Sequence, residues 1–192
     1  MAMGEEVELF GGWMSPFSRR VELGLKLKGI DYKYHEEDLK NKSDFLLTYN
    51  PIYKKVPVFL HNGNPISESL IILEYIDQVW NSLYPFFPQQ NPYETAQARF
   101  WANYIDDKKE LQNKKFFGGN KIGIVDIVGT VIAYWIPAIE EAFGFELLTT
   151  KKFPKLTKWS EEIVNNSVVK QVLPPKSKLV AYFELQVVSI TN

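Results

Sequence analysis

Residues 54–77, KKVPVFLHNGNPISESLIILEYID, hold the densest set of structural signals in the chain. Residues 56–61 alternate apolar and other side chains and are rich in β-branched and aromatic types, which is typical of a strand. The sequence NGN at 62–64 predicts a turn, and a second short strand is expected around 65–66. Apolar residues at helical spacing follow over 70–76. We therefore predict a β-hairpin that leads directly into a helix.

Polar residues occupy the start of this helix, at Ser67, Glu68 and Ser69. The first N–H groups of a helix lack intrahelical partners and carry the positive end of its dipole, so an anion could bind here. The alternative is that Ser67 or Ser69 simply caps the helix. Pro57 cannot donate to a central strand, so it indicates an edge strand, a bulge or a cis peptide bond.

The composition narrows the class of protein. The chain has 192 residues, 45% of them hydrophobic, which is enough for one compact unit or two small domains. Its formal net charge of −1 gives no general attraction to nucleic acid or to an anionic membrane. The absence of cysteine excludes disulfides and thiolate catalysis by the protein. The two histidines, His35 and His61, are far apart and both expected at the surface, so we expect no metal site.

A cytoplasmic location is expected, because residues 1–10 carry acidic side chains where a secretory signal would carry basic ones. The most apolar stretch, 123–139, contains Asp126 and Pro137 and is shorter than the roughly 20 residues of a membrane span. We predict a buried core helix there.

Two domains are expected. The first, residues 1–80, is predicted to follow the order βαβ-α-ββα, with elements over 7–10, 16–28, 30–35, 44–49, 56–61, 65–66 and 70–76. Residues 81–93 contain three prolines and no helical period, which indicates a linker. The remaining domain, residues 94–192, is predicted to be all-helical, with apolar helical segments over 95–109, 124–143, 154–165 and 179–190.

Ser15 stands between the first strand and a helix that begins at Pro16, a residue that suits the first helical turn. Its hydroxyl can point into the cleft at the carboxyl edge of the sheet, or it can serve as a plain N-cap. The sequence does not resemble a hydrolase with a catalytic triad, because it has no serine flanked by glycines as in a nucleophile elbow and no histidine placed as an obvious base. A serine hydroxyl of this kind is a poor nucleophile but a good hydrogen-bond donor, so it could stabilise a thiolate of another molecule.

Four segments occur in the order and spacing of one family: WMSPFSRRVELGLKLKGIDYKYHEEDL, LKNKSDFLLTYNP, KKVPVFLHNGNPISESLIILEYID and FFGGNKIGIVDI. In these segments the chain resembles the plant tau-class glutathione transferases, and the resemblance covers nearly its whole length. It implies a thioredoxin-like α/β N-terminal domain, an all-α C-terminal domain, and the conjugation of glutathione to hydrophobic electrophiles in detoxification and the stress response. Glutathione is then a co-substrate, and no cofactor is implied.

The resemblance also assigns the site. Ser15 would be the catalytic serine, with Ser18, one turn further, as its rival. The residues implied for glutathione binding are Lys42, Lys55, Val56, Glu68 and Ser69, with Pro57 as the cis-proline.

The chemistry of glutathione agrees with this set, because the tripeptide carries two carboxylates and an ammonium besides its thiol. Lys42 and Lys55 suit the glycyl carboxylate, and Glu68 suits the ammonium. Ser69 and the helix N-terminus suit the γ-glutamyl carboxylate. Val56 would offer its backbone to the cysteinyl unit as an added strand does.

The apolar wall for the electrophile is predicted from aromatic and aliphatic residues at Trp13, Phe17, Trp101, Tyr104 and Ile105. The alternative is that this aromatic stripe belongs to the core. Asp126 lies three residues after Gly123 and fits the helix-capping aspartate of the fold, a structural residue.

One departure from the family limits the prediction. Members have a long helical hairpin between the counterparts of Tyr104 and Phe116, and here only residues 105–115 connect them. The gap falls where the family builds much of its electrophile pocket and part of its dimer interface. We expect a homodimer, and an intact glutathione site could coexist here with poor turnover or impaired dimerisation. A non-catalytic protein that binds glutathione or hydrophobic ligands is the alternative function. A splice variant and a degenerate copy both explain such a gap.

Overall fold

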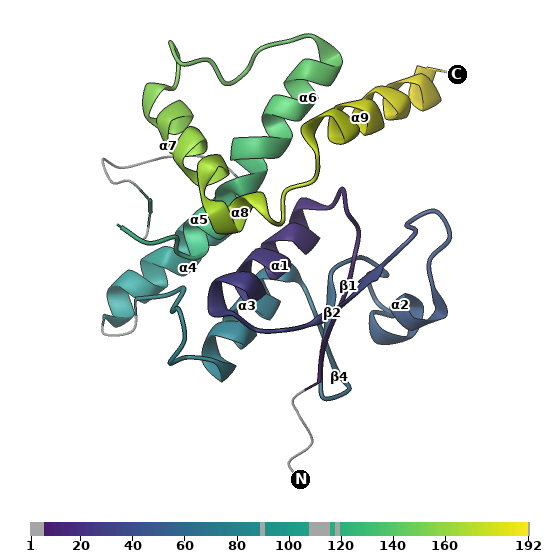
Figure 1. Cartoon of the computed structure of the whole chain (residues 1–192), viewed down its shortest axis with the longest axis vertical. Helices are drawn as coiled ribbons and strands as arrows, with labels where there is room; N and C mark the ends of the chain where they lie inside the picture. The colour runs from purple at the N-terminus through teal and green to yellow at the C-terminus, as the bar shows by residue number, and fades with distance from the viewer. Residues whose placement is uncertain (1–5, 89–90, 108–115, 118–119, 192) are drawn as a thin grey trace. The chain divides into compact units, whose positions relative to one another are not determined.

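The computed structural model of the protein describes residues 6–88, 91–107, 116–117 and 120–191. The chain divides into two compact units, Met1–Pro85 and Phe86–Asn192 (Figure 1). Within the described part of the chain, each helix is too short or too polar to span a lipid bilayer.

The first unit has the predicted order βαβ-α-ββα. Its elements are β1 (Val7–Gly11), α1 (Pro16–Lys28), β2 (Lys33–Glu36), α2 (Asp44–Tyr49), β3 (Val58–His61), β4 (Asn64–Ser67) and α3 (Ser69–Val79). The strand order in the sheet is β2-β1-β3-β4. Strand β1 pairs parallel with β2 and antiparallel with β3, and β3 pairs antiparallel with β4. The expected α/β architecture of this domain is confirmed.

Strand β2 begins later than predicted. Gly29 ends α1 in the left-handed conformation, with φ of 68°, and its N–H donates to Lys26 O at 3.1 Å. The N–H of Ile30 then donates to Leu25 O at 3.0 Å, which is a Schellman closure of the helix. Because Ile30 still belongs to this closure, pairing with β1 starts only at Lys33, opposite Glu8. The prediction of a strand over 30–35 was wrong at its start for this reason.

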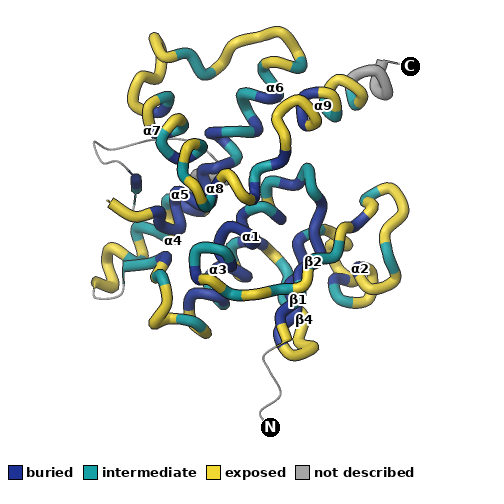
Figure 2. Tube along the Cα trace, in the orientation of Figure 1, coloured by how far each residue is buried: buried dark blue, intermediate teal, exposed yellow. Residues whose placement is uncertain are grey.

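Helices cover both faces of the sheet, with α2 on one side and α1 and α3 on the other (Figure 1). On the α2 side, Leu46 packs in one buried cluster with Phe10, Val58 and Leu60. The alternate residues of β1 and β3 point to the other face, where the ring of Phe59 lies 6.1 Å from that of Tyr75 in α3. The central strands are mostly buried: all of β3 is buried, and so is β1 except for Glu8, which is intermediate (Figure 2).

The histidine prediction was wrong for His61, which is only 7% exposed. It ends β3, a strand flanked by β1 and β4, so its side chain enters the covered face of the sheet. Its Nδ1 lies 2.8 Å from the Tyr75 hydroxyl, and its ring lies 5.1 Å from that of Trp80. His35 is half-buried, with Nε2 at 2.6 Å from Glu8 Oε2. Among the described residues, no group of three histidine, cysteine or acidic side chains is arranged to hold a metal ion.

Lys28 joins the ends of α1 and α3. Its ammonium is buried, pairs with Asp77 Oδ1 at 2.8 Å, and donates to the carbonyls of Trp80 at 3.0 Å and Tyr84 at 2.9 Å. A cation at the carbonyl end of α3 compensates the negative end of the helix dipole. This contact ties the end of α1 to the end of α3, the helix that begins at the polar residues Glu68 and Ser69.

Gly11, at the end of β1, is a position where a side chain has no room. A Cβ there would lie 2.8 Å from Tyr34 Oη and 3.0 Å from Ser18 Cβ. We expect Gly11→Ala to lower the free energy of unfolding by about 1–3 kcal/mol, the usual cost of overpacking. Urea unfolding of both variants measures this. Gly12→Ala is the matched control, because the nearest atom to its Cβ would be the movable Sδ of Met14, at 3.3 Å, and the next two would be at ordinary contact distances of 3.8 and 3.9 Å. Equal losses in the two variants would contradict the steric argument.

The second unit is helical within its described residues. Its elements are α4 (Pro92–Asp107), α5 (Ile124–Thr130), η1 (Val131–Trp135), α6 (Ile136–Phe143), α7 (Pro154–Asn165), α8 (Ser167–Lys170) and α9 (Lys176–Thr191). The predicted helix over 124–143 is present, but it contains the π-helical turn η1. Pro137 follows this turn closely, and its missing N–H and bulky ring are incompatible with a regular α-helical turn before it. The wider turn accommodates the proline without ending the helix.

Candidate functional site

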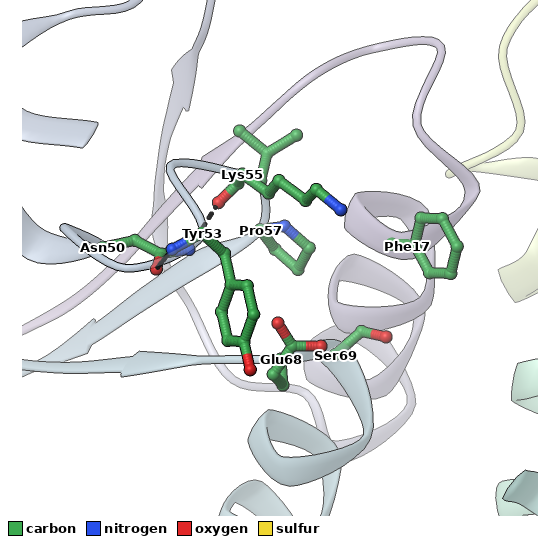
Figure 3. Close-up of a pocket in the computed structure, with 8 residues that line it drawn as sticks. Phe17, Asn50, Tyr53, Lys55, Pro57, Glu68 and Ser69 are labelled. Carbon is green, nitrogen blue, oxygen red and sulfur yellow. Dashed lines mark hydrogen bonds between the residues drawn. The ribbon is translucent and has the colours of Figure 1, made fainter. Parts of the chain in front are cut away.

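A cavity of about 390 Å³ opens in the first unit (Figure 3). Its lining comes from the start of α1, the loop between α2 and β3, and the start of α3: Phe17, Asn50, Tyr53, Lys55, Val56, Pro57, Glu68 and Ser69. The volume is in the range of small-molecule sites. Four residues predicted to bind glutathione therefore lie around one opening, whereas Lys42 is exposed and does not line it.

The loop between α2 and β3 gives the cavity an extended backbone edge. The Val56–Pro57 peptide bond is cis. Pro57 precedes β3, which begins at Val58, so the missing N–H removes no hydrogen bond from the strand. The expectation that Pro57 lies inside a strand, and so marks an edge or bulge, was therefore wrong, and the cis-bond alternative describes it.

Asn50 shapes the same loop and was missed as a site residue. Its Nδ2 donates to Lys55 O at 3.0 Å, and its Oδ1 accepts from the N–H of Tyr53 at 3.2 Å. The available signal was the Asn50–Pro51 pair, which favours a turn after a helix. In the sequence this pair indicates only that the helix over 44–49 ends, and the bracing of the loop that follows depends on the fold. Tyr53, whose ring points toward Glu68 in Figure 3, was missed as well.

Helix α3 begins without a side-chain cap. The N-cap position is Glu68, with φ of 73°, and neither Ser67 nor Ser69 caps the helix. Ser69 is instead the first helical residue, buried, with its Oγ 3.5 Å from Arg20 Nη1. The capping alternative was therefore wrong, because the chain enters the helix one residue later than a serine cap at 67 requires. The first N–H groups of α3 consequently have no side-chain cap and can donate hydrogen bonds to a bound anion.

Charges of both signs face this opening. Figure 3 shows the Lys55 ammonium on one side and the Glu68 carboxylate on the other, with Ser69 beside Glu68. A zwitterionic ligand with separated carboxylates and an ammonium can satisfy this arrangement, whereas a purely apolar ligand cannot.

Ser15 is the N-cap of α1. Its Oγ accepts from the N–H of Ser18 at 3.3 Å, and the residue is 7% exposed. Capping uses the oxygen as an acceptor, so the hydroxyl hydrogen remains able to donate. Both predicted roles, cap and donor, are therefore compatible in one side chain. Ser15 does not line the cavity itself, although Phe17, two residues later, does.

Ser18, the rival serine, is 0% exposed. Its Oγ accepts from the N–H of Gly12 at 3.2 Å, inside the junction between β1 and α1. A fully buried hydroxyl cannot contact a ligand, so the structure favours Ser15 over Ser18.

Three ionisable groups near this junction have shifted pKa values. Burial raises the pKa of the Glu22 carboxyl, against the Arg19 guanidinium, which lowers it. Burial also raises the pKa of the Tyr32 hydroxyl, and the neighbouring Glu22 carboxylate raises it further. Burial likewise raises the pKa of Tyr34. Both phenols stay protonated at neutral pH, and Tyr32 can donate to Glu22 Oε1 at 2.9 Å.

The residues predicted for the electrophile wall lie on both units. Phe17 is 45% exposed and lines the cavity, and Trp13 is half-buried in the same unit. Trp101 is half-buried in α4, next to the ring of Phe100. Tyr104 and Ile105 also belong to α4, but their side chains lie outside the described residues.

Asp126 is buried at the start of α5. Its Oδ2 accepts from the N–H of Gly123 at 2.9 Å, and its Oδ1 accepts from the N–H of Phe117 and from Trp159 Nε1, both at 2.9 Å. It joins three separate segments of the second unit by hydrogen bonds, as a structural residue would.

Known families match both units. The model of the glutathione S-transferase N-terminal domain matches residues 5–78, and that of the glutathione S-transferase C-terminal domain matches residues 107–166. The chain is 46% identical to glutathione S-transferase U8 of Arabidopsis thaliana, with all of both chains covered. It is also 46% identical to a probable glutathione S-transferase of Glycine max, covering 99% of this chain and 98% of that protein.

Two solved structures have the same fold. A tau-class glutathione S-transferase from mango is 36% identical with a TM-score of 0.86, covering 94% of this chain and 98% of that one. A rice glutathione transferase, solved in complex with glutathione, is 31% identical with a TM-score of 0.87, covering 96% of this chain and 97% of that one.

The comparison also shows a gap. The alignment with the Arabidopsis relative has 224 positions for a chain of 192 residues, so at least 32 positions hold no residue of this chain. The gap is predicted to lie between Tyr104 and Phe116. This interval includes residues 108–115, which lie outside the described residues. The identity over the full length of both proteins is nevertheless decisive: the chain belongs to the tau class of plant glutathione transferases.

Proposed function

We propose that this glutathione transferase binds glutathione in the cavity of its first unit and adds the glutathione thiolate to hydrophobic electrophiles, with Ser15 donating a hydrogen bond to the sulfur. The observation that carries the proposal is the meeting, at one cavity, of a cation, a carboxylate and an uncapped helix N-terminus. Glutathione has the complementary groups.

Each end of the tripeptide has a partner at this cavity. Lys55 would pair with the glycyl carboxylate, and Lys42, exposed before α2, would reach the same group when glutathione is bound. Ser69 and the first N–H groups of α3 would bind the γ-glutamyl carboxylate, and Glu68 its ammonium. The backbone of Val56 would pair with the cysteinyl unit, as an added strand does.

Catalysis by Ser15 follows from the acidity of the thiol. A free cysteine thiol has a pKa of about 8.5, so only a few per cent is thiolate at neutral pH. A hydrogen bond from Ser15, together with the N-terminus of α1, favours the charged sulfur. With a chlorinated nitrobenzene as acceptor, the carbon–sulfur bond forms, chloride leaves, and the thiol proton passes to solvent.

Lys55 provides a test of the binding geometry. We expect Lys55→Met to raise KM for glutathione about three- to tenfold, because a charge-assisted hydrogen bond is lost at a partly solvated site. The kcat should change less than about twofold, since uniform binding is lost. Steady-state kinetics with varied glutathione measure both constants.

Lys54→Met is the matched control. Lys54 is the neighbouring exposed lysine and does not line the cavity. An equal rise of KM in both variants would indicate a general loss of positive charge rather than a contact with glutathione, and would contradict the assignment of Lys55.

The alternative function, a non-catalytic binder of glutathione or hydrophobic ligands, is motivated by the gap of at least 32 positions. The full-length similarity to glutathione transferases supports the catalytic function over it. Retention on a glutathione resin without any conjugation would select the alternative, and failure to bind the resin would reject both.

Assembly, location and the electrophile wall belong to the same proposal. We propose a homodimer whose assembly is weakened by the gap, in the cytoplasm, with Trp13, Phe17, Trp101, Tyr104 and Ile105 contacting the electrophile. The exposure of Phe17 at the cavity supports its part in this wall.

Light scattering on the purified chain measures the oligomeric state, and a stable dimer would contradict the weakened assembly.

A further inference from the structure

The turn that precedes Ser15 is held by hydrogen bonds on every backbone polar group of its first two residues. Gly12 O accepts from the N–H of Ser15 at 2.9 Å, which closes a β-turn over residues 12–15. The N–H of Gly12 donates to Ser18 Oγ at 3.2 Å. The two remaining groups, the N–H and the carbonyl of Trp13, are bound by charged side chains from elsewhere in the unit.

Glu36 binds the first of these groups. It is the last residue of β2 and lies opposite Gly11 of β1 in the parallel pairing. From there its Oε1 accepts from the N–H of Trp13 at 2.9 Å. The N–H of Glu37 donates to Gly11 O at 2.8 Å. The end of β2 therefore stays hydrogen-bonded to β1 up to the residue before the turn.

Arg19 binds the second group. It lies in α1, directly after Ser18, and its Nε donates to the Trp13 carbonyl at 3.1 Å. The guanidinium is held in turn, because Nη1 contacts Glu22 Oε2 and the group lies over the ring of Tyr34, 5.5 Å from its centroid. Glu22 is fixed by the hydroxyl of Tyr32, at 2.9 Å. Both members of the Arg19–Glu22 pair are largely buried, which limits the alternative positions of the arginine.

These contacts determine the direction of Ser15. Only Met14 separates Trp13 from Ser15, and Pro16 fixes the backbone after it. A rotation of either peptide group of Trp13 would therefore move the serine hydroxyl relative to a bound sulfur, while the cavity residues of the α2–β3 loop and α3 would stay in place.

We propose that Arg19 and Glu36 are positioning residues for Ser15: by binding the carbonyl and the N–H of Trp13 they hold the turn in the conformation in which the hydroxyl stabilises the glutathione thiolate. The inference rests on the proposed role of Ser15. Neither residue needs to contact glutathione, so loss of either should affect the sulfur rather than the affinity for the tripeptide.

The test uses the full-length chain with Arg19→Met and Glu36→Met, which remove the donor and the acceptor. The thiol pKa of bound glutathione is obtained from the ultraviolet absorbance of the thiolate against pH. We expect this pKa to rise by roughly half a unit to one unit and kcat to fall about three- to tenfold, the effect of one lost hydrogen bond. The Kd for glutathione, measured at a pH where the thiol is protonated, should change less than about twofold.

Glu36→Gln is the conservative variant, because it removes the charge but keeps an oxygen that accepts from Trp13 N–H. It should restore the thiol pKa to the wild-type value. Asp31→Asn, an exposed acid in the loop before β2, controls for a general change of surface charge. If Arg19→Met does not fold, Glu36→Met and Glu36→Gln decide the question by themselves.

The outcomes separate this inference from the proposed function. Unchanged thiol pKa values in Arg19→Met and Glu36→Met, with a raised value in Ser15→Ala, would overturn the positioning role and leave the role of Ser15 intact. An unchanged pKa in Ser15→Ala would overturn both. A loss of glutathione affinity in the methionine variants without a change in the thiol pKa would assign Arg19 and Glu36 to binding and contradict the inference.

Discussion

Ser15→Ala is expected to lower kcat for conjugation of a chlorinated nitrobenzene by about 10- to 100-fold, because a hydrogen bond to a charged sulfur contributes about 1.5–3 kcal/mol. Ser15 does not line the cavity, so KM for glutathione should change much less than kcat. Steady-state kinetics with both substrates varied give the two constants.

The same substitution also removes the N-cap of α1, at a cost of about 0.5–2 kcal/mol in stability, and this effect must be separated from catalysis. Ser43→Ala is the control, because Ser43 caps α2 with its Oγ accepting from Leu46 N–H at 3.1 Å; its hydroxyl also donates to Glu37 Oε1 at 2.6 Å. It should lose comparable stability and retain kcat within about twofold. Full turnover in Ser15→Ala would rule out the role given to this serine.

Asp126→Ala is expected to have the largest effect on stability, a loss of about 3–5 kcal/mol, because three donors would lose a buried acceptor at once. The unfolding transition reported by tryptophan fluorescence in urea measures it, since Trp159 is one of the three partners.

Asp126→Asn should lose less, because its one remaining oxygen can still accept from two of the donors. A loss below about 1 kcal/mol in Asp126→Ala would show that water or another side chain replaces the carboxylate, and would contradict the structural role of Asp126.

Helix boundaries set by local chemistry could be predicted from the sequence. Pro16 and Gly29 mark the ends of α1, and the predicted range of 16–28 agrees with the structure. Pro154 likewise starts α7 at the predicted residue. In each case a proline or glycine acts through its own backbone, so no knowledge of the tertiary contacts is needed.

Features that depend on tertiary contacts could not be predicted in the same way. The burial of His61 follows from the central place of β3 in the sheet and from Tyr75, fourteen residues away. The late start of β2 follows from the competition between helix closure and strand pairing at Ile30. The links of Arg19 and Glu36 to Trp13 join side chains of α1 and β2 to the backbone of the turn between β1 and α1, and no local pattern identifies them.

In the candidate site, too, some residues could be predicted from the sequence and others could not. Lys55, Val56, Glu68 and Ser69 were named from the family's motifs, and they line one cavity. Asn50 and Tyr53 line it too, but their types are common in any turn, so only the fold singles them out. The wall predicted for the electrophile draws its residues from both units, and it stays a prediction.

The central claim is that Ser15 stabilises the thiolate of bound glutathione, and the most direct measurement is the pKa of that thiol in the complex. Titration of the thiolate absorbance in the wild-type complex should give a value clearly below that of the free thiol, about 8.5. In Ser15→Ala the value should return most of the way toward it. Equal thiol pKa values in the wild-type and Ser15→Ala complexes would contradict the account.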